Sequence, residues 1–125
     1  MTIYKIHGIT DEVTTCDCCG KSKLSRTVGL ENESGEVLYF GTTCAARALR
    51  QKGKSDVIVQ RAMRLQRIRP VADFVSSNMH KGITAAVTAG KEYAATISKD
   101  ISVSGYDSWG KVNIDGVGAR IEVFA

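Results

Sequence analysis

Four cysteines are the residues of this 125-residue chain whose type and spacing point to chemistry. Cys16, Cys18 and Cys19 crowd into one short segment, and Cys44 follows in Gly-Thr-Thr-Cys-Ala-Ala. A Cys-x-x-Cys-Gly segment lets two thiolates face one ion, and Gly20 suits the tight turn because glycine tolerates a positive φ. Thiolate-rich tetrahedral sites usually hold zinc. The spacing therefore predicts a structural Zn²⁺ site formed by Cys16, Cys19 and Cys44.

Other interpretations of the cysteines stay open. A metal-free fold would also bury them, because free cysteine packs well in a core. A redox Cys-x-x-Cys usually sits at a helix start after a strand, whereas here a hairpin is expected to follow it. Disulfides fit poorly, because a bridge between adjacent Cys18 and Cys19 would be strained. A catalytic zinc is not expected, since thiolate-only coordination makes a weak Lewis acid and no His-x-Glu base is present.

The fourth ligand of such a site is not fixed by the sequence. Structural zinc takes four ligands, and Cys18, His7 and His80 are equal candidates, with Asp17 a weaker one. His7 lies on the segment that enters the cysteine cluster, and His80 lies at the end of an expected helix.

A β-hairpin is the first element expected to position the cysteines. Residues 24–40 alternate apolar and polar side chains on either side of a polar turn that contains Gly35, which predicts two paired strands. Residues 3–9 and 12–15 also have an extended pattern.

A helix is expected to carry the fourth cysteine. It starts after Gly41, with Thr42 or Thr43 as its cap, and ends near Gly53. Cys44 then lies in the first turn, where the helix dipole lowers the pKa of a thiol.

The rest of the chain is predicted to continue with helices and then strands. A helix opens at the Ser-Asp pair 55–56, Pro70 ends it or begins the next one, and residues 71–79 form a third short helix. Short period-two segments from residue 83 onward predict an antiparallel meander of three to five strands, although the Ala-rich piece Ile83–Ala95 could be helical. The fold class is α+β. The expected parts are a zinc module (1–54), a basic helical segment (55–82) and a β-meander (83–125), packed as one compact unit.

A Cys-x-x-Cys-Gly turn, a hairpin and a cysteine at a helix start follow one another in this chain. This order resembles a treble-clef zinc finger over about residues 13–53. A treble clef takes its fourth ligand one turn further along the helix, where this chain has Arg47 or Ala48. The Cys-x-x-Cys-Gly and Phe-Gly-x-x-Cys-Ala-Ala segments also resemble small bacteriophage or prophage proteins. That resemblance implies a phage origin and no particular activity.

Positive charge gathers in the middle of the chain, although the net charge is only +4. Residues 44–70 hold eight basic side chains against one acidic one, Asp56. This asymmetry favours an anionic partner, although a solvated helical face would have the same composition. We expect nucleic acid to be bound through Arg47, Arg50, Arg61, Arg64 and Arg67. The alternative is a phage-encoded inhibitor that binds a host or anti-phage defence protein complex.

No enzymatic activity is expected. The chain lacks a phosphate-binding Gly-x-x-x-x-Gly-Lys loop and a Ser-His-Asp order. It also lacks an apolar stretch long enough to span a bilayer and a signal-peptide pattern at its start. The expected location is the cytoplasm of a bacterial host cell, where thiols stay reduced.

Overall fold

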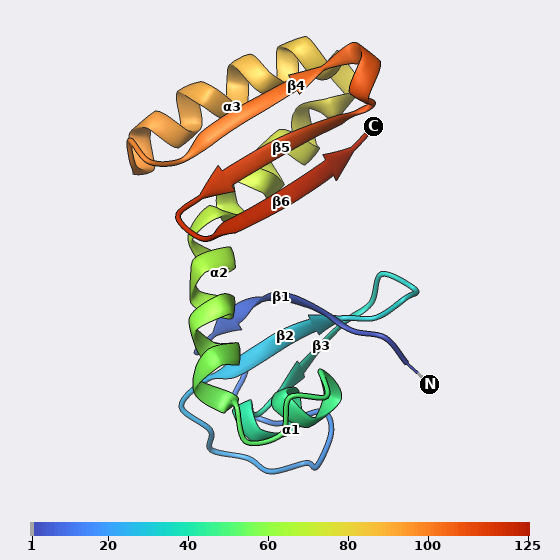
Figure 1. Cartoon of the computed structure of the whole chain (residues 1–125), viewed down its shortest axis with the longest axis vertical. Coiled ribbons are helices and arrows are strands. Elements are labelled where there is room, and N and C mark those ends of the chain that lie inside the picture. Colours follow the sequence, from blue (N-terminus) through green and yellow to red (C-terminus); the bar gives the residue numbers. More distant parts are fainter. Residues whose placement is uncertain (1) are drawn as a thin grey trace. The chain divides into compact units, whose positions relative to one another are not determined.

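The computed structural model describes residues 2–125, which form two compact units joined within one long helix. The N-terminal unit ends at Gln66 and the C-terminal unit begins at Arg67, inside α2 (Ser55–Asn78). Each unit contains a three-stranded antiparallel sheet and its own buried core (Figure 1). The structure is therefore α+β, as predicted.

The division into parts differs from the expected boundaries after residues 54 and 82. The first half of α2 buries Ile58 and Ala62 in the N-terminal core, whereas its second half buries Ile68 and Val71 in the C-terminal core. The helix thus belongs to both units, because its apolar positions serve two different cores.

The N-terminal sheet has the order β1-β2-β3, with β2 (Thr27–Glu31) at its centre. Strands β1 (Lys5–Thr10) and β3 (Val37–Phe40) pair with it antiparallel. The predicted hairpin over 24–40 is confirmed. Residues 12–15, for which an extended pattern was expected, form no strand, and the Val13 carbonyl accepts a hydrogen bond from the hydroxyl of Thr27.

The hairpin leads directly into α1 (Thr42–Ala48). The helix is shorter than expected, because it ends before Leu49 and Arg50 has a φ of 59°. Its N-cap is Gly41, which offers no side chain, so the expected threonine cap is wrong. The helix packs Ala45 and Ala46 into a core with Cys16 of the loop between β1 and β2 and with residues of the sheet and of α2, namely Val28, Leu30, Phe40, Ile58 and Ala62.

Helix α2 runs through Pro70, where the sequence predicted a break. Proline removes the N–H that would bond the carbonyl of Gln66, at a cost of about 3 kcal/mol in a helix interior. Pro70 is exposed, while Ile68 and Val71 on either side of it are fully buried. Burial of these neighbours holds the helical backbone, so the expected third helix over 71–79 is the end of α2, followed by the 3-10 helix η1 (Met79–Lys81).

The expected strands between residues 83 and 97 are wrong, and the helical alternative for this Ala-rich piece is correct: it forms α3 (Ile83–Ile97). Its buried residues recur at helical spacing and are Ile83, Ala86, Val87, Gly90 and Ala94. The alternation of Thr with Ala and Val is visible in the sequence, but alanine favours helix strongly. In this helix Gly90 lies against Val75 of α2, where an added Cβ would be 2.6 Å from a methyl group.

The antiparallel meander is confirmed for the last part of the chain only. It consists of β4 (Ser102–Tyr106), the 3-10 helix η2 (Asp107–Trp109), β5 (Lys111–Gly116) and β6 (Ala119–Phe124). Strand β5 lies at the centre of the sheet. Its buried Val112 and Ile114 join the core formed with α2 and α3.

None of the helices within residues 2–125 is both long and apolar enough to cross a membrane.

Candidate metal centre and basic surface

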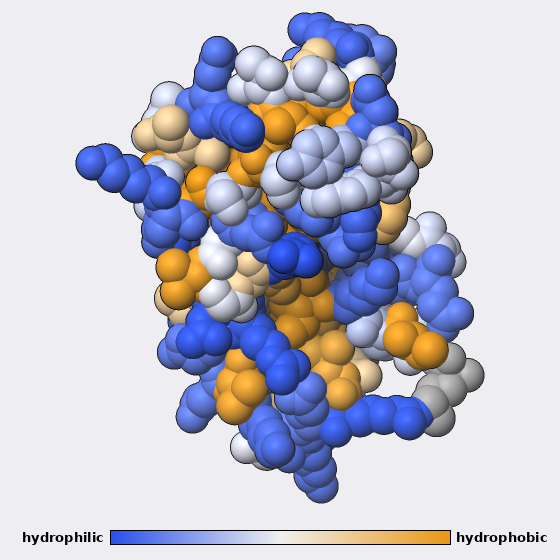
Figure 2. Space-filling model, turned by 45° about the horizontal axis from the view of Figure 1, so that its top comes forward, coloured by the Kyte–Doolittle hydropathy of each residue, from blue (hydrophilic) through white to orange (hydrophobic). Residues whose placement is uncertain are grey.

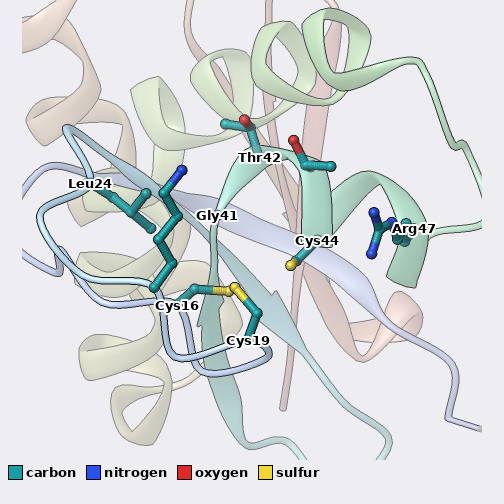
Figure 3. Close-up of a pocket in the computed structure, with 9 residues that line it drawn as sticks. Cys16, Cys19, Leu24, Gly41, Thr42, Cys44 and Arg47 are labelled. Carbon is teal, nitrogen blue, oxygen red and sulfur yellow. The ribbon is translucent and has the colours of Figure 1, made fainter.

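Three cysteine sulfurs converge in the N-terminal unit. The Sγ atoms of Cys16, Cys19 and Cys44 all lie within 4.8 Å of one another. Figure 3 shows the Cys44 sulfur, from α1, directed toward those of Cys16 and Cys19, which lie on the loop between β1 and β2. The predicted grouping of these three residues is therefore present, and all three are free thiols.

The loop that carries Cys16 and Cys19 is closed by backbone hydrogen bonds. The N–H of Gly20 donates to the carbonyl of Cys16 at 2.8 Å, and the N–H of Cys16 donates to the carbonyl of Lys21 at 2.9 Å. Gly20 has a φ of +75°, which a residue with a Cβ rarely adopts. The predicted tight turn at Gly20 is confirmed, and it places both sulfurs on one side of the loop.

Asp17 fastens this loop to β3. Its backbone N–H donates to the carbonyl of Tyr39 at 2.8 Å, and its carboxylate Oδ2 accepts the N–H of Tyr39 at 2.8 Å. The two bonds hold the cysteine loop beside the strand that leads to Cys44. Asp17 thus orients the site, a role that sequence reasoning, which considered it only as a weak ligand, did not identify.

Gly41 lies beside the cysteine loop at the start of α1, and a side chain there would make only ordinary contacts. A Cβ at this position would lie 3.9 Å from the Cβ of Cys16, 4.0 Å from its Sγ and 3.4 Å from a methyl of Leu24. The backbone of Gly41 also hydrogen-bonds the Cys16 sulfur. A glycine directly before a predicted helix was the only available signal for this contact.

The local environment separates the pKa values of two of the thiols. Burial of Cys16 acts to raise its pKa, but hydrogen bonds from the backbone of Gly41, Cys19 and Cys18 outweigh it and lower the pKa to about 7. Burial raises the pKa of Cys44 to about 12, and the neighbouring cysteine thiols add to the effect. The expected lowering of the Cys44 pKa by the helix dipole is therefore wrong for the metal-free protein, because burial and crowding of like groups dominate.

This donor set fits a thiophilic cation. Three thiolates within 4.8 Å of one another would repel strongly, whereas a shared cation favours the deprotonated form of all three. Tetrahedral Zn–S bonds of about 2.3 Å would separate the sulfurs by about 3.8 Å, within that limit. Cys16, Cys19 and Cys44 can therefore hold a metal ion.

No fourth His, Cys, Asp or Glu donor among residues 2–125 joins this group. Cys18 is exposed, although its thiol contributes to the raised pKa of Cys44. His7 lies on β1 with its Nδ1 3.9 Å from a carboxylate oxygen of Glu31. His80 lies in η1 of the C-terminal unit. The structure thus brings together the three predicted cysteines without adding one of the candidate fourth ligands.

A hollow of about 390 Å³ opens beside the three sulfurs. Figure 3 shows side chains from the cysteine loop and from α1 around it. Besides the cysteines, its lining comprises two basic residues, two threonines, one leucine and one glycine, namely Lys21, Arg47, Thr42, Thr43, Leu24 and Gly41.

The predicted basic residues divide into two groups. Arg67 belongs to the C-terminal unit, where its guanidinium bonds Asp100 at 2.7 Å and the hydroxyl of Ser98 at 2.8 Å. The other members are exposed and none forms an ion pair with another described residue: Arg47, Arg50, Arg61 and Arg64. Figure 2 shows hydrophilic side chains, in blue, projecting over much of one face of the molecule.

Comparison with protein-family models, with curated proteins and with solved structures finds no match for this chain.

Proposed function

We propose that this chain is a non-enzymatic zinc-binding protein whose N-terminal unit is a treble-clef-like module. The convergence of three sulfurs on one point carries the proposal. Thiolate ligands select zinc among the common divalent ions. The ion would join the loop after β1 to the start of α1, and its binding energy would contribute to folding of the unit.

Metal analysis of the purified protein tests this proposal. One zinc per chain is expected, and Cys16→Ser or Cys44→Ser should lose it. Cys18→Ser addresses the open fourth ligand, because Cys18 is exposed and outside the group, yet its thiol acts on that of Cys44. A chain that binds no zinc after reduction and reconstitution would refute the assignment.

We further propose that four exposed arginines of the N-terminal unit bind the phosphates of nucleic acid. Arg47, Arg50, Arg61 and Arg64 support it, because they are exposed and no carboxylate of the described chain neutralises them. Arginine presents a planar fork of donors that matches phosphate oxygens. Arg67 does not support it, since its guanidinium is engaged by Asp100.

The salt dependence of binding provides the test. If these four arginines each contact a phosphate of duplex DNA, the logarithm of the affinity should fall against the logarithm of the salt concentration with a slope of roughly −3.6. Affinity would then drop roughly 150-fold between 50 and 200 mM salt. Fluorescence anisotropy with a labelled oligonucleotide measures both quantities.

Charge-reversal variants make the test specific. Arg61→Glu combined with Arg64→Glu should abolish retention of the oligonucleotide. Lys91→Glu combined with Lys99→Glu changes the net charge equally at exposed positions of the C-terminal unit, and should retain binding. Equal losses in both double variants would show that net charge alone is responsible.

A second candidate function is that of a phage-encoded inhibitor that binds a host or defence protein complex. An exposed aromatic pair favours it: Tyr106 and Trp109 pack edge to face with ring centroids 4.6 Å apart, and 61% and 47% of their surfaces are exposed. Tyrosine and tryptophan are enriched at the energetic centres of protein interfaces. If no oligonucleotide binds at ~50 mM salt, where electrostatic attraction is strong, capture of a host complex that Trp109→Ala abolishes would support this function instead.

A further inference from the structure

The three sulfurs and the hollow beside them form a site with a distinct charge pattern. The hollow is lined by the three cysteines Cys16, Cys19 and Cys44 and by two cationic residues, Lys21 and Arg47. All these residues belong to the N-terminal unit, so the site is complete within it.

We infer that this hollow binds a phosphate-type oxyanion, which completes the coordination of the metal while Lys21 and Arg47 hold its remaining oxygens. This inference rests on the proposed zinc site and identifies the phosphate as a ligand of it. If this inference holds, the metal site binds a ligand and also cross-links the cysteine loop to α1.

The ligand count supports the inference. Zinc in proteins is usually four-coordinate, and a site with three protein ligands accepts an external one. Among residues 2–125, no other side chain of a ligating type joins the three cysteines. The hollow borders Cys16, Cys19 and Cys44 together, so an external group can approach the metal from this side.

The charges around the hollow favour an anion. Three thiolates and one divalent cation sum to a single negative charge, and Lys21 and Arg47 on the rim change this to a single positive charge. A monoanion therefore brings the whole site to neutrality. Neither basic side chain forms an ion pair with another residue of the described chain, so both remain available to a ligand.

The types of hydrogen-bond donor favour an oxyanion in particular. The Arg47 guanidinium matches two oxygens of a phosphate at once. Thr42 and Thr43 line the same hollow, and a threonine hydroxyl can donate one hydrogen bond. Leu24 lies beside Gly41 and also lines the hollow. A phosphate of nucleic acid presents this chemistry, and so does free inorganic phosphate.

Cobalt substitution provides the test, because Co²⁺ replaces zinc and its d–d bands report the fourth ligand. The Co²⁺-loaded protein is titrated with inorganic phosphate while the visible spectrum and the ³¹P linewidth of phosphate are recorded. A saturable spectral change with ³¹P broadening is expected. Lys21→Ala and Arg47→Ala should each weaken phosphate roughly tenfold. Arg26→Ala and Lys52→Ala, at exposed positions outside the hollow, should leave the affinity unchanged.

Three results would overturn the inference. The first is a spectrum that phosphate does not change. The second is a sulfur-to-cobalt charge-transfer band whose intensity falls in Cys18→Ser by the contribution of one thiolate. Cys18 would then be the fourth ligand. The third is phosphate binding that the Lys21 and Arg47 variants do not weaken.

The same experiment separates this inference from the proposed function. A chain without cobalt or zinc refutes the metal site and the inference together. A metal-loaded chain whose spectrum ignores phosphate refutes only the inference. If phosphate binds at the metal and a mononucleotide or oligonucleotide does not, the oxyanion site stands while nucleic-acid binding fails.

Discussion

Replacing Asp17 tests whether the cysteine loop is held in place by its link to β3. Asp17 accepts the N–H of Tyr39 through Oδ2 and donates its own N–H to the carbonyl of the same residue, both at 2.8 Å. Asp17→Ala removes the first bond and leaves the second. Since Cys16 immediately precedes Asp17, loss of the anchor should allow the sulfurs to separate in the metal-free protein.

The expected loss follows from the type of bond. A hydrogen bond to a charged group contributes about 1.5–3 kcal/mol, and the lower end applies because Asp17 is exposed. About 1.4 kcal/mol corresponds to a tenfold change in an equilibrium constant. Asp17→Ala should therefore weaken zinc binding roughly tenfold, within the range seen when groups that orient ligands are removed.

Competition with a chelator of known affinity measures this effect. Asp17→Asn should recover most of the loss, because the amide oxygen can still accept the Tyr39 N–H. Asp11→Ala, an exposed carboxylate that precedes the loop, serves as the control. If zinc affinity in Asp17→Ala stays within twofold of the original, the loop is held by other contacts and the reasoning fails. If Asp17→Asn and Asp17→Ala lose binding equally and the cobalt spectrum changes, Asp17 acts as a ligand.

Three further predictions concern each unit by itself. Removing metal with a chelator should increase amide hydrogen exchange in the N-terminal unit while the C-terminal core stays protected, because binding energy stabilises only the unit that holds the ligands. Gly90→Ala should lower the stability of the C-terminal unit by about 1 kcal/mol, because the new Cβ would lie 2.6 Å from a methyl of Val75. Overpacking costs about 1–3 kcal/mol, which exceeds the gain of about 1 kcal/mol in helix propensity. Thermal melting measures the change, and Val75→Ala in the double variant should relieve the loss. The hydrogen bond from Arg67, followed by that from Ser98, holds the pKa of Asp100 well below its usual range. The ion pair therefore stabilises the fold at pH values above 3.8, the pKa of Asp in the unfolded chain, and this contribution is lost as the pH falls below that value. Asp100→Asn should flatten the acid limb of the curve of stability against pH, and an unchanged acid limb would contradict the ion pair.

The sequence by itself determined the local parts of the candidate site. The Cys-x-x-Cys-Gly segment requires a tight turn, and Gly20 has the positive φ that such a turn uses. The hairpin over 24–40 follows from alternation and a polar turn, and the fourth cysteine follows it at the start of a helix. These features depend on neighbours in the chain, which is why spacing and residue type sufficed.

The sequence left the long-range contacts of the site undetermined. Nothing in the spacing of Asp17 and Tyr39 indicates the pair of hydrogen bonds that joins them. The pKa of Cys44 is raised by burial and by three other thiols, an effect that only the packed site produces. Arg67 belongs to the same run of arginines as Arg61, yet its guanidinium is engaged by Asp100 across the C-terminal unit.

Tertiary packing also decided two elements that local pattern assigned incorrectly. Alternating Thr and Ala or Val between residues 83 and 97 fits a strand, but the structure buries Ile83, Ala86, Val87, Gly90 and Ala94 together, which a helix allows. Pro70 locally opposes helix continuation, but burial of Ile68 and Val71 on either side outweighs the missing hydrogen bond. The sequence thus determined which residues can ligate a metal and where the chain turns. The packing of apolar faces decided which helices persist and which charged groups stay exposed, because burial energy depends on contacts between residues distant in the chain.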